Sequence, residues 1–227
     1  MSTETSYSNE RLAEAARYAL MRRLMPAIRH HIAGSLQPIG MMSAMLEKRI
    51  QAATPDIVQL GKNAQALTAV TREAAATSLN LMAWLAPRDN DLVAVNSAIE
   101  ESFSMVATEL SFRGFSLVVD TADASAKLPR GVLRSVFTAS LIALTDSAKG
   151  VANVVVSSSQ EAGSTLLKIS IVKDRTTEPG MVQNPMSSYR ALQWDDVQAL
   201  AAAEGAQLHL APDSVQIAYL PTSLSIA

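Results

Sequence analysis

Apolar residues recur at helical spacing along two consecutive segments in the first third of the chain. Between Asn9 and about Ala52, apolar and small residues follow one another at intervals of four and three, which is typical of the buried seam of a helix. These positions are Ile28, Ile32, Ser35, Ile39, Met42, Leu46 and Ile50. A second segment repeats this rhythm from Ile57 to Leu85 and ends at Pro87. The pattern therefore predicts two long helices.

The two predicted helices are joined by a short turn. We expect Thr54 to be the N-cap of the second helix and Pro55 its first residue, because proline is well tolerated at the start of a helix. Two long helices with a short connection form an antiparallel hairpin. A lone hairpin leaves its apolar stripe half covered, and pairing with a second copy into a four-helix bundle covers the rest. We therefore predict a homodimer.

The remainder of the chain has a mixed pattern of short strands and helices. Its predicted elements are a helix at about 96–112, a strand at 115–120, a largely apolar helix at 128–148, strands at 151–159 and 164–174, a loop at 175–190, a helix at 194–205 and a closing hairpin turned at Pro212-Asp213. This order favours a mixed sheet with helices on one face. The sequence thus predicts an α+β protein, with a helical domain at 1–87 and a sheet domain at 88–227.

Composition and charge narrow the classes of protein that fit this pattern. Of 227 residues, 48% are hydrophobic and the formal net charge is -2, which favours a folded protein over a disordered tail or a general nucleic-acid binder. The lack of cysteine excludes disulfides, thiolate catalysis and cysteine-based zinc sites. The N-terminus lacks the order of a signal peptide, and no apolar run approaches the roughly 20 residues that span a bilayer. We expect a cytoplasmic protein that binds neither membranes nor nucleic acid.

Two of the three histidines are adjacent, His30 and His31, and lie within the first predicted helix. If the apolar positions form the helix seam, His30 lies opposite it, and His31 points about 100° away from His30. Histidine pairs that bind metal on a helix are spaced four residues apart on one face, so this pair is a poor metal site. From helical position alone, His30 is either a reachable nucleophile or one more polar surface residue.

The neighbours of His30 favour a functional site. On its face or beside it lie Arg23, Arg29, Gly34 and Gln37. Gly34 costs helix stability, roughly 1 kcal/mol relative to alanine, and lets the backbone or phosphate of a partner approach closely. Pro26 and Pro38 bracket the segment, and each removes one helix hydrogen bond. Together these residues describe a helix shaped around an exposed imidazole.

Residues 30–46, HHIAGSLQPIGMMSAML, resemble the phosphoacceptor box of bacterial sensor histidine kinases, in the variant written HDFNNLLQPI. On that pattern His30 takes the place of the phosphorylated histidine, and residues 36–39 match outright. The predicted hairpin is similar to the dimerisation and phosphotransfer domain of the same family. Two positions differ: His31 replaces the acidic residue that assists autophosphorylation, and Gly34 replaces the polar residue used in the phosphatase reaction.

The predicted sheet domain is similar in element order to the GHKL α/β sandwich that binds ATP in these kinases. Residues 134–148 resemble the family's helix QVLLNLLLNALDA, but Ala139 and Ala143 replace its two asparagines, one of which holds Mg²⁺. The other departures are Thr176 and Glu178 at the glycine positions that follow Asp174 in the DxGxG motif, and ALQW (191–194) in place of GLGL. Without these glycines, side chains fill the space where backbone N–H groups approach phosphate. The resemblance implies a degenerate ATPase-like domain and no cofactor.

The resemblance as a whole implies a histidine phosphotransferase of a bacterial two-component phosphorelay. His30 would accept a phosphoryl group from the aspartate of one response-regulator receiver domain and pass it to another, with Mg²⁺ supplied by the receiver. The surrounding roles would be charge balance by Arg23 and Arg29, and a docking surface lined by His31, Gly34 and Gln37.

Two other functions fit parts of the same pattern. One is a non-catalytic pseudokinase or scaffold that binds and regulates a sensor histidine kinase or a response regulator, and His31 in place of the acidic residue favours it. The other is an active ATP-dependent kinase, which Ala139 and Ala143 disfavour because alanine offers no ligand for Mg²⁺.

Overall fold

The computed structural model describes residues 2–84, 91–121, 126–148, 150–161, 163–173 and 190–220. The chain divides into two compact units. The hairpin unit is Met25–Pro87, and the sheet unit combines Met1–Leu24 with Arg88–Ala227. The hairpin unit ends where the predicted helical domain ends, whereas the first 24 residues group with the sheet unit.

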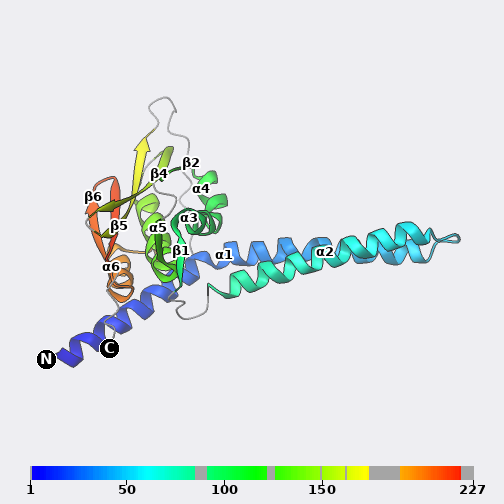
Figure 1. Ribbon diagram of the computed structural model, residues 1–227, viewed down its shortest axis with the longest axis horizontal. Coiled ribbons are helices and arrows are strands. Elements are labelled where there is room, and N and C mark those ends of the chain that lie inside the picture. Colours follow the sequence, from blue (N-terminus) through cyan, green and yellow to red (C-terminus); the bar gives the residue numbers. More distant parts are fainter. Residues whose placement is uncertain are drawn as a thin grey trace. The chain divides into compact units, whose positions relative to one another are not determined.

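The first helix, α1 (Ser2–Ile50), is continuous and begins earlier than predicted (Figure 1). Pro26 and Pro38 both lie inside it, so each leaves one helical carbonyl without its usual donor. Five of the seven predicted seam residues of α1 are buried or half-buried, namely Ile28, Ser35, Ile39, Met42 and Leu46. The other two, Ile32 and Ile50, are exposed, and His31 is half-buried where the prediction had Ile32. The helical periodicity of this segment is therefore confirmed.

The second helix, α2 (Ile57–Met82), begins slightly later than predicted. Its N-cap is Asp56, whose carboxylate accepts a hydrogen bond from the backbone N–H of Gln59 at 3.1 Å. The expectation that Thr54 caps this helix and Pro55 begins it was wrong. The Asp56 carboxylate satisfies a free N–H of the first turn and carries the negative charge that a helix N-terminus favours.

The sheet unit is built on a mixed sheet, as the sequence predicts. In the part of the chain that the structure describes, its strand order is β2 (Phe115–Thr121), β4 (Ala152–Glu161), β5 (Ser164–Lys173), β7 (Ser214–Tyr219) and β6 (Ala206–Ala211). β2 runs parallel to β4, and every other neighbouring pair is antiparallel. The predicted strand pair β4–β5 and the closing hairpin β6–β7 are confirmed.

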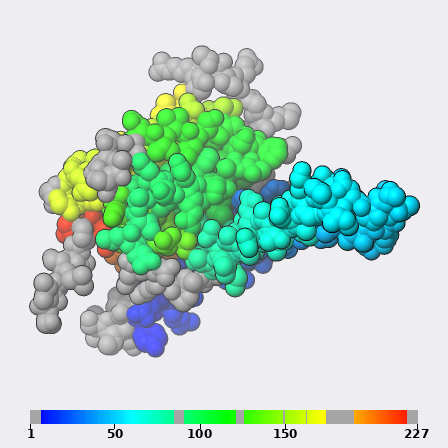
Figure 2. All heavy atoms as spheres, turned by 45° about the vertical axis from the view of Figure 1, so that its right-hand side comes forward, coloured from blue at the N-terminus to red at the C-terminus, as the bar shows by residue number. Residues whose placement is uncertain are grey.

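Helices cover one face of this sheet. They are α3 (Val95–Ser104), α4 (Ala107–Phe112), the π-helical turn η1 (Val132–Phe137), α5 (Thr138–Ser147) and α6 (Trp194–Ala203). Alternate residues of β4 are buried beneath them, and these are Ala152, Val154 and Val156. Residues 91–121 and 126–148 form one continuous region of the surface in the space-filling view (green, Figure 2). The core of this unit lies between the sheet and its helices.

Two predicted helices of the sheet unit are interrupted. The helix expected at 96–112 is divided at Met105 and Val106 into α3 and α4, and both of these side chains are buried. The helix expected at 128–148 is preceded by β3 (Lys127–Pro129), which pairs with β1 (Leu92–Ala94) in a small antiparallel sheet. The predicted loop at 175–190 lies outside the described residues except for Arg190.

Candidate functional site

His30 lies on α1 in the hairpin unit, and its side chain is exposed. Helical phase places it away from the seam that faces α2, as the spacing of the apolar positions predicts. Its imidazole can therefore be reached from solvent. This is the first requirement for a side chain that reacts with a group held by another protein.

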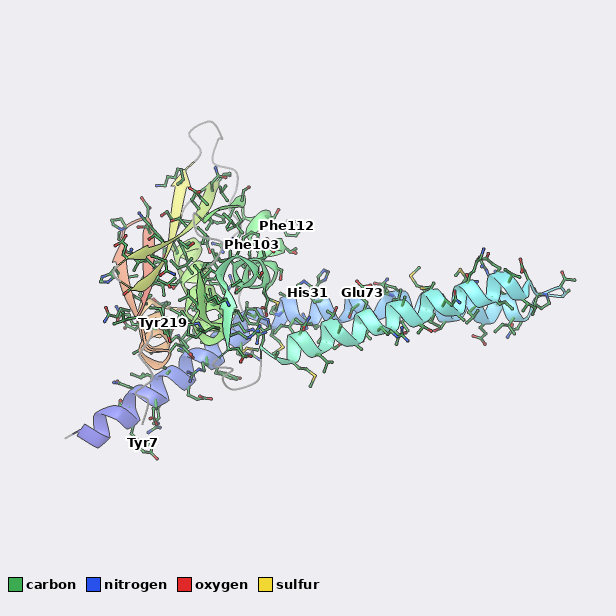
Figure 3. All side chains as sticks on the ribbon, in the orientation of Figure 1. Tyr7, His31, Glu73, Phe103, Phe112 and Tyr219 are labelled. Atoms are coloured by element: carbon green, nitrogen blue, oxygen red, sulfur yellow. The ribbon has the colours of Figure 1, made fainter. Side chains whose placement is uncertain are left out.

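His31 occupies a different environment although it is adjacent. Its side chain is half-buried on α1 (labelled in Figure 3), and its ring centroid lies 6.2 Å from that of His30 with an interplanar angle of 64°. Nδ1 of His31 is buried and has no hydrogen-bond partner within the part of the chain that the structure describes. An unpaired buried polar atom costs free energy, about 1–3 kcal/mol. His31 thus lies at the edge of the helix seam, with part of its ring turned inward.

Three further exposed residues of α1 share the side on which His30 lies. We call this surface the His30 face and define it as His30, Gly34, Gln37 and Met41, which follow one another at intervals of four, three and four. Such residues lie one above the other along a helix. Met41 is 67% exposed, so the His30 face has an apolar side chain at its far end, about three turns from the imidazole. Arg29 is also exposed and lies next to His30 in sequence.

Gly34 has open space around it. A Cβ atom built at this position meets nothing within 4 Å among the described residues beyond the helix's own backbone. Packing within the single chain therefore gives no reason for a glycine in the middle of a helix, where it costs about 0.5–1 kcal/mol. The open space lies one turn from His30, where the backbone of a docked partner could approach.

A Gly34→Ala variant is expected to raise the free energy of unfolding of the chain by about 0.5–1 kcal/mol, because alanine favours the helix and meets no neighbour. Urea unfolding followed by circular dichroism measures this change. The matched control is Ala33→Gly at the adjacent exposed position, which is expected to lose a similar amount. A destabilised Gly34→Ala variant would show that the glycine is needed inside the chain itself.

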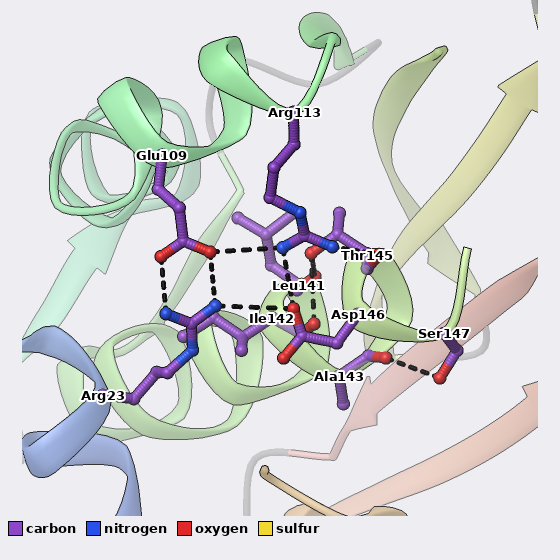
Figure 4. Close-up of polar contacts among 9 residues, drawn as sticks. All are labelled: Arg23, Glu109, Arg113, Leu141, Ile142, Ala143, Thr145, Asp146 and Ser147. Carbon is purple, nitrogen blue, oxygen red and sulfur yellow. Dashed lines mark hydrogen bonds and ion pairs between the residues drawn. The ribbon is translucent and has the colours of Figure 1, made fainter. Parts of the chain in front are cut away.

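The side chain of Arg23 is not open to a partner, although the sequence predicts that it balances charge at His30. It belongs to the sheet unit, and its side chain is 9% exposed. Its guanidinium donates to both carboxylate oxygens of Glu109, at 2.6 Å from Nη1 and at a shorter distance from Nη2, and lies 3.4 Å from Oδ1 of Asp146 (Figure 4). A guanidinium held in this way is not available to balance charge at His30.

The environment of Arg23 fixes its charge. Burial by itself lowers the pKa of Arg23, but the hydrogen bonds and negative charges of Glu109 and Asp146 outweigh burial and raise this pKa above its ordinary value. Sequence reasoning identified Arg23 but missed Glu109, Asp146 and their second partner, Arg113. No local signal marks them, because Glu109 and Asp146 lie 86 and 123 residues from Arg23 along the chain.

The positions that would hold nucleotide in the resembling kinases offer no polar group here. Ala139 and Ala143 are 0% and 2% exposed, and α5 is buried on all sides from Thr138 to Thr145. Asp174, Thr176 and Glu178 lie outside the described residues. On α5, therefore, neither replaced position presents an oxygen ligand to a metal ion.

Among the described residues, no group of three or more histidine, aspartate or glutamate side chains is arranged to hold a metal ion. Within the same ranges, no helix combines the length and the apolar character needed to cross a bilayer.

Comparison with known proteins gives likeness in structure only. No protein-family model and no curated protein matches the sequence. Similar solved structures include an Acinetobacter baumannii histidine kinase, AdeS, at 17% identity and a TM-score of 0.44, covering 80% of this chain and 96% of that one.

Two further solved structures are similar over most of this chain. One is a bacterial phosphotransferase, at 13% identity and a TM-score of 0.39, covering 88% of this chain and 94% of that one. The other is the histidine kinase ThkA in complex with the response regulator TrrA, at 12% identity and a TM-score of 0.39, covering 96% of this chain and 66% of that one. Such distant likenesses assign neither an activity nor a partner to this chain.

Proposed function

We propose that this chain is a histidine phosphotransferase that carries a phosphoryl group on His30 between response-regulator receiver domains of a phosphorelay. The observation that carries the proposal is the His30 face, in which an exposed imidazole stands one turn from a glycine that the chain's own packing does not require. The match of residues 30–46 to a phosphoacceptor box supports the same assignment.

The chemistry needs little from the chain beyond an exposed nucleophile. An imidazole nitrogen of His30 attacks the phosphorus of an aspartyl phosphate, so a P–N bond forms as the bond from phosphorus to the carboxylate oxygen breaks. The aspartate leaves as a carboxylate, and the proton of the imidazole passes to solvent. Transfer to a second receiver reverses these steps. The receiver supplies the acidic pocket and the Mg²⁺ that neutralise charge on the transferring group.

The proposed phosphotransfer does not use ATP. Alanine at 139 and 143, both buried, removes the amide oxygen that would hold Mg²⁺ against a triphosphate. His31 replaces the acidic residue that would assist attack on ATP, and part of its imidazole is buried. These features support a chain that receives its phosphoryl group from another protein.

The proposed active form is a homodimer. Exposed apolar or small residues run along one side of each hairpin helix: Met25, Ile32 and Leu36 on α1, and Ile57, Ala64, Ala75, Leu79 and Met82 on α2. Leu36 is 52% exposed and Leu79 is 67% exposed in the single chain. A second copy that packs its hairpin against these two stripes buries them in a four-helix bundle.

A Leu36→Glu variant is expected to be monomeric, because a charge in the bundle core is not paired. Light scattering after size-exclusion chromatography measures the mass, which is expected to be twice that of the chain for the wild type and equal to it for the variant. Ala66→Glu places the same charge at an exposed position on another side of α2 and is expected to leave the dimer intact. Equal masses for wild type and Leu36→Glu would contradict the proposed interface.

A scaffold that binds a receiver or a kinase without transfer is the second candidate. It is favoured by His31, because an imidazole in place of an acid removes the group that assists phosphorylation in the resembling kinases. Both candidate functions predict that a partner binds the His30 face. They differ in whether a covalent phosphohistidine forms.

The test is to mix the full chain with candidate receivers that carry radiolabelled aspartyl phosphate. A phosphotransferase is expected to gain label within minutes, in a form that is labile to acid and stable to base. Binding without any label from any receiver would support the scaffold and overturn the phosphotransferase. Label from ATP alone, without a receiver, would show a kinase instead.

A further inference from the structure

The part of α1 that belongs to the sheet unit buries one narrow stripe of small and apolar residues. Its members are Ala13, Ala16, Ala19, Leu20 and Leu24, which are at most 4% exposed. They recur at intervals of three and four with one adjacent pair, so they form one side of the helix. Alanines let this side approach its support closely. Residues 13–24, which we call the docked arm, are thus packed within the sheet unit.

Arginines flank the stripe on both sides. Nη2 of Arg17 donates to Oε1 of Glu204 at 2.9 Å, and Glu204 follows the last turn of α6. Six residues later, Arg23 makes its bonds to Glu109 on α4. Gly131 leaves space for the Glu204 carboxylate that binds Arg17, because a Cβ atom at position 131 would collide with this carboxylate. The docked arm is therefore attached by a charged pair at each flank, with apolar packing between them.

The receptor for Arg23 is built without any residue of α1. Arg113 of the α4–β2 connection donates to Oε1 of Glu109 at 3.2 Å and to Oδ1 of Asp146 at 2.7 Å. It also donates to the carbonyl oxygen of Thr145 at 2.6 Å and lies over the ring of Phe115 at 5.2 Å (Figure 4 shows the polar contacts). We call Glu109, Arg113 and Asp146 the arginine socket. Arg113 holds both carboxylates in position, so the socket does not need Arg23 to be formed.

The charges of the arginine socket favour the docked arm, and they are also compatible with its release. With Arg23 bound, two guanidinium groups face two carboxylates and the cluster is neutral. Without Arg23, the two carboxylates still share Arg113, and they are 31% and 21% exposed, so water reaches them. Arg23 for its part becomes solvated when the arm leaves. Whether the arm is docked or released, no charged side chain is left buried without an opposite charge or water. An ion pair that is buried in every state would not allow this.

We infer that the docked arm is a releasable element of the fold, held on the sheet unit by the arginine socket and able to detach while the sheet stays folded. The arm continues without a break into the part of α1 that carries His30, seven residues beyond Arg23. Docking therefore restrains the helix on which the phosphoryl group is carried, and a partner that displaces the arm changes that restraint. This consequence for transfer rests on the proposed function, whereas the docking itself does not.

Hydrogen–deuterium exchange of the full chain measures release of the arm separately from opening of the sheet. In an Arg23→Met variant, the amides of residues 13–24 are expected to exchange at least about tenfold faster than in the wild type, because a charge-assisted pair no longer holds the arm. The amides of β4 and β5 are expected to keep their rates. The control, Arg11→Met, removes an exposed arginine of the same helix and is expected to change neither segment.

Charge reversal provides a second test. Arg23→Glu is expected to speed the exchange of residues 13–24 more than Arg23→Met does, because it sets a carboxylate against those of Glu109 and Asp146. Unchanged exchange of residues 13–24 in Arg23→Met would overturn the inference. So would faster exchange of β4 and β5 to the same extent, or a variant that does not fold, because the arm would then be inseparable from the core. Exchange needs no receiver, so a failure of phosphotransfer leaves this test unaffected.

Discussion

A His30→Ala variant is expected to take no label from any phosphorylated receiver, a loss of at least about 1,000-fold relative to the wild type. The reason is chemical, because alanine offers no nitrogen to form the P–N bond. His31 follows in sequence, but its ring is half-buried with Nδ1 turned inward. The measurement is label retained by the chain after rapid mixing with a phosphorylated receiver and denaturing electrophoresis.

The variant is expected to fold as the wild type does. His30 is exposed and its side chain makes no hydrogen bond to a described residue, so its removal leaves no unsatisfied buried partner. Far-ultraviolet circular dichroism and receiver binding are therefore expected to be unchanged. His31→Ala is the matched control and is expected to keep its label. Label that survives His30→Ala and disappears in His31→Ala would contradict the assignment of the nucleophile.

The helical hairpin was predictable because its signal is local and repeated. Two long runs with apolar residues at intervals of three and four leave few alternatives to a pair of packed helices, and five of the seven predicted seam positions of α1 are buried or half-buried. The start of α2 was less predictable. Pro55 is a good first helical residue, yet Asp56 competes with Thr54 for the capping role and prevails by accepting from Gln59.

The sheet unit was predictable in its strands and less so in its helices. Strand β4 contains the apolar run 154–156 and β5 the largely apolar run 166–172, and a short turn separates the two strands, which is a strong signal for a hairpin. The apolar stretch at 128–148 carries no periodicity, because α5 is buried on all sides. Nothing in such a stretch shows that its first residues pair as β3 with β1 instead of joining the helix.

The location of Arg23 shows a different limit of sequence reasoning. Helical phase correctly relates Arg23 to His30, since residues seven apart share one side of a helix. The position of a residue around a helix does not show which other parts of the chain contact its side chain. Arg23 meets carboxylates from α4 and α5, which are distant in sequence, and the helix that carries it belongs to two units along its length.

An Arg113→Met variant is expected to lower the free energy of unfolding of the sheet unit by about 1.5–3 kcal/mol, which corresponds to a decrease in Tm of roughly 5–10 °C. The Arg113 side chain is 5% exposed and forms ion pairs with both carboxylates of the socket, those of Glu109 and Asp146. Its loss leaves the Thr145 carbonyl without this donor and leaves Glu109 and Asp146 with Arg23 alone. Thermal and urea unfolding of the full chain measure the change.

The control for this prediction is Arg190→Met, which breaks a pair whose arginine is 44% exposed. Exposed pairs contribute about 0–1 kcal/mol, so this variant is expected to unfold close to the wild type. A loss of less than about 1 kcal/mol for Arg113→Met would show that the socket does not stabilise the unit.

A double-mutant cycle of Arg113→Met with Arg23→Met separates the two arginines. Each single variant leaves the carboxylates of Glu109 and Asp146 with one cation, whereas the double variant leaves two neighbouring negative charges with none. The double variant is therefore expected to lose more stability than the sum of the single variants, by about 1–3 kcal/mol. Strict additivity would mean that the two arginines do not share their acids, and the socket would then not be a single charged network.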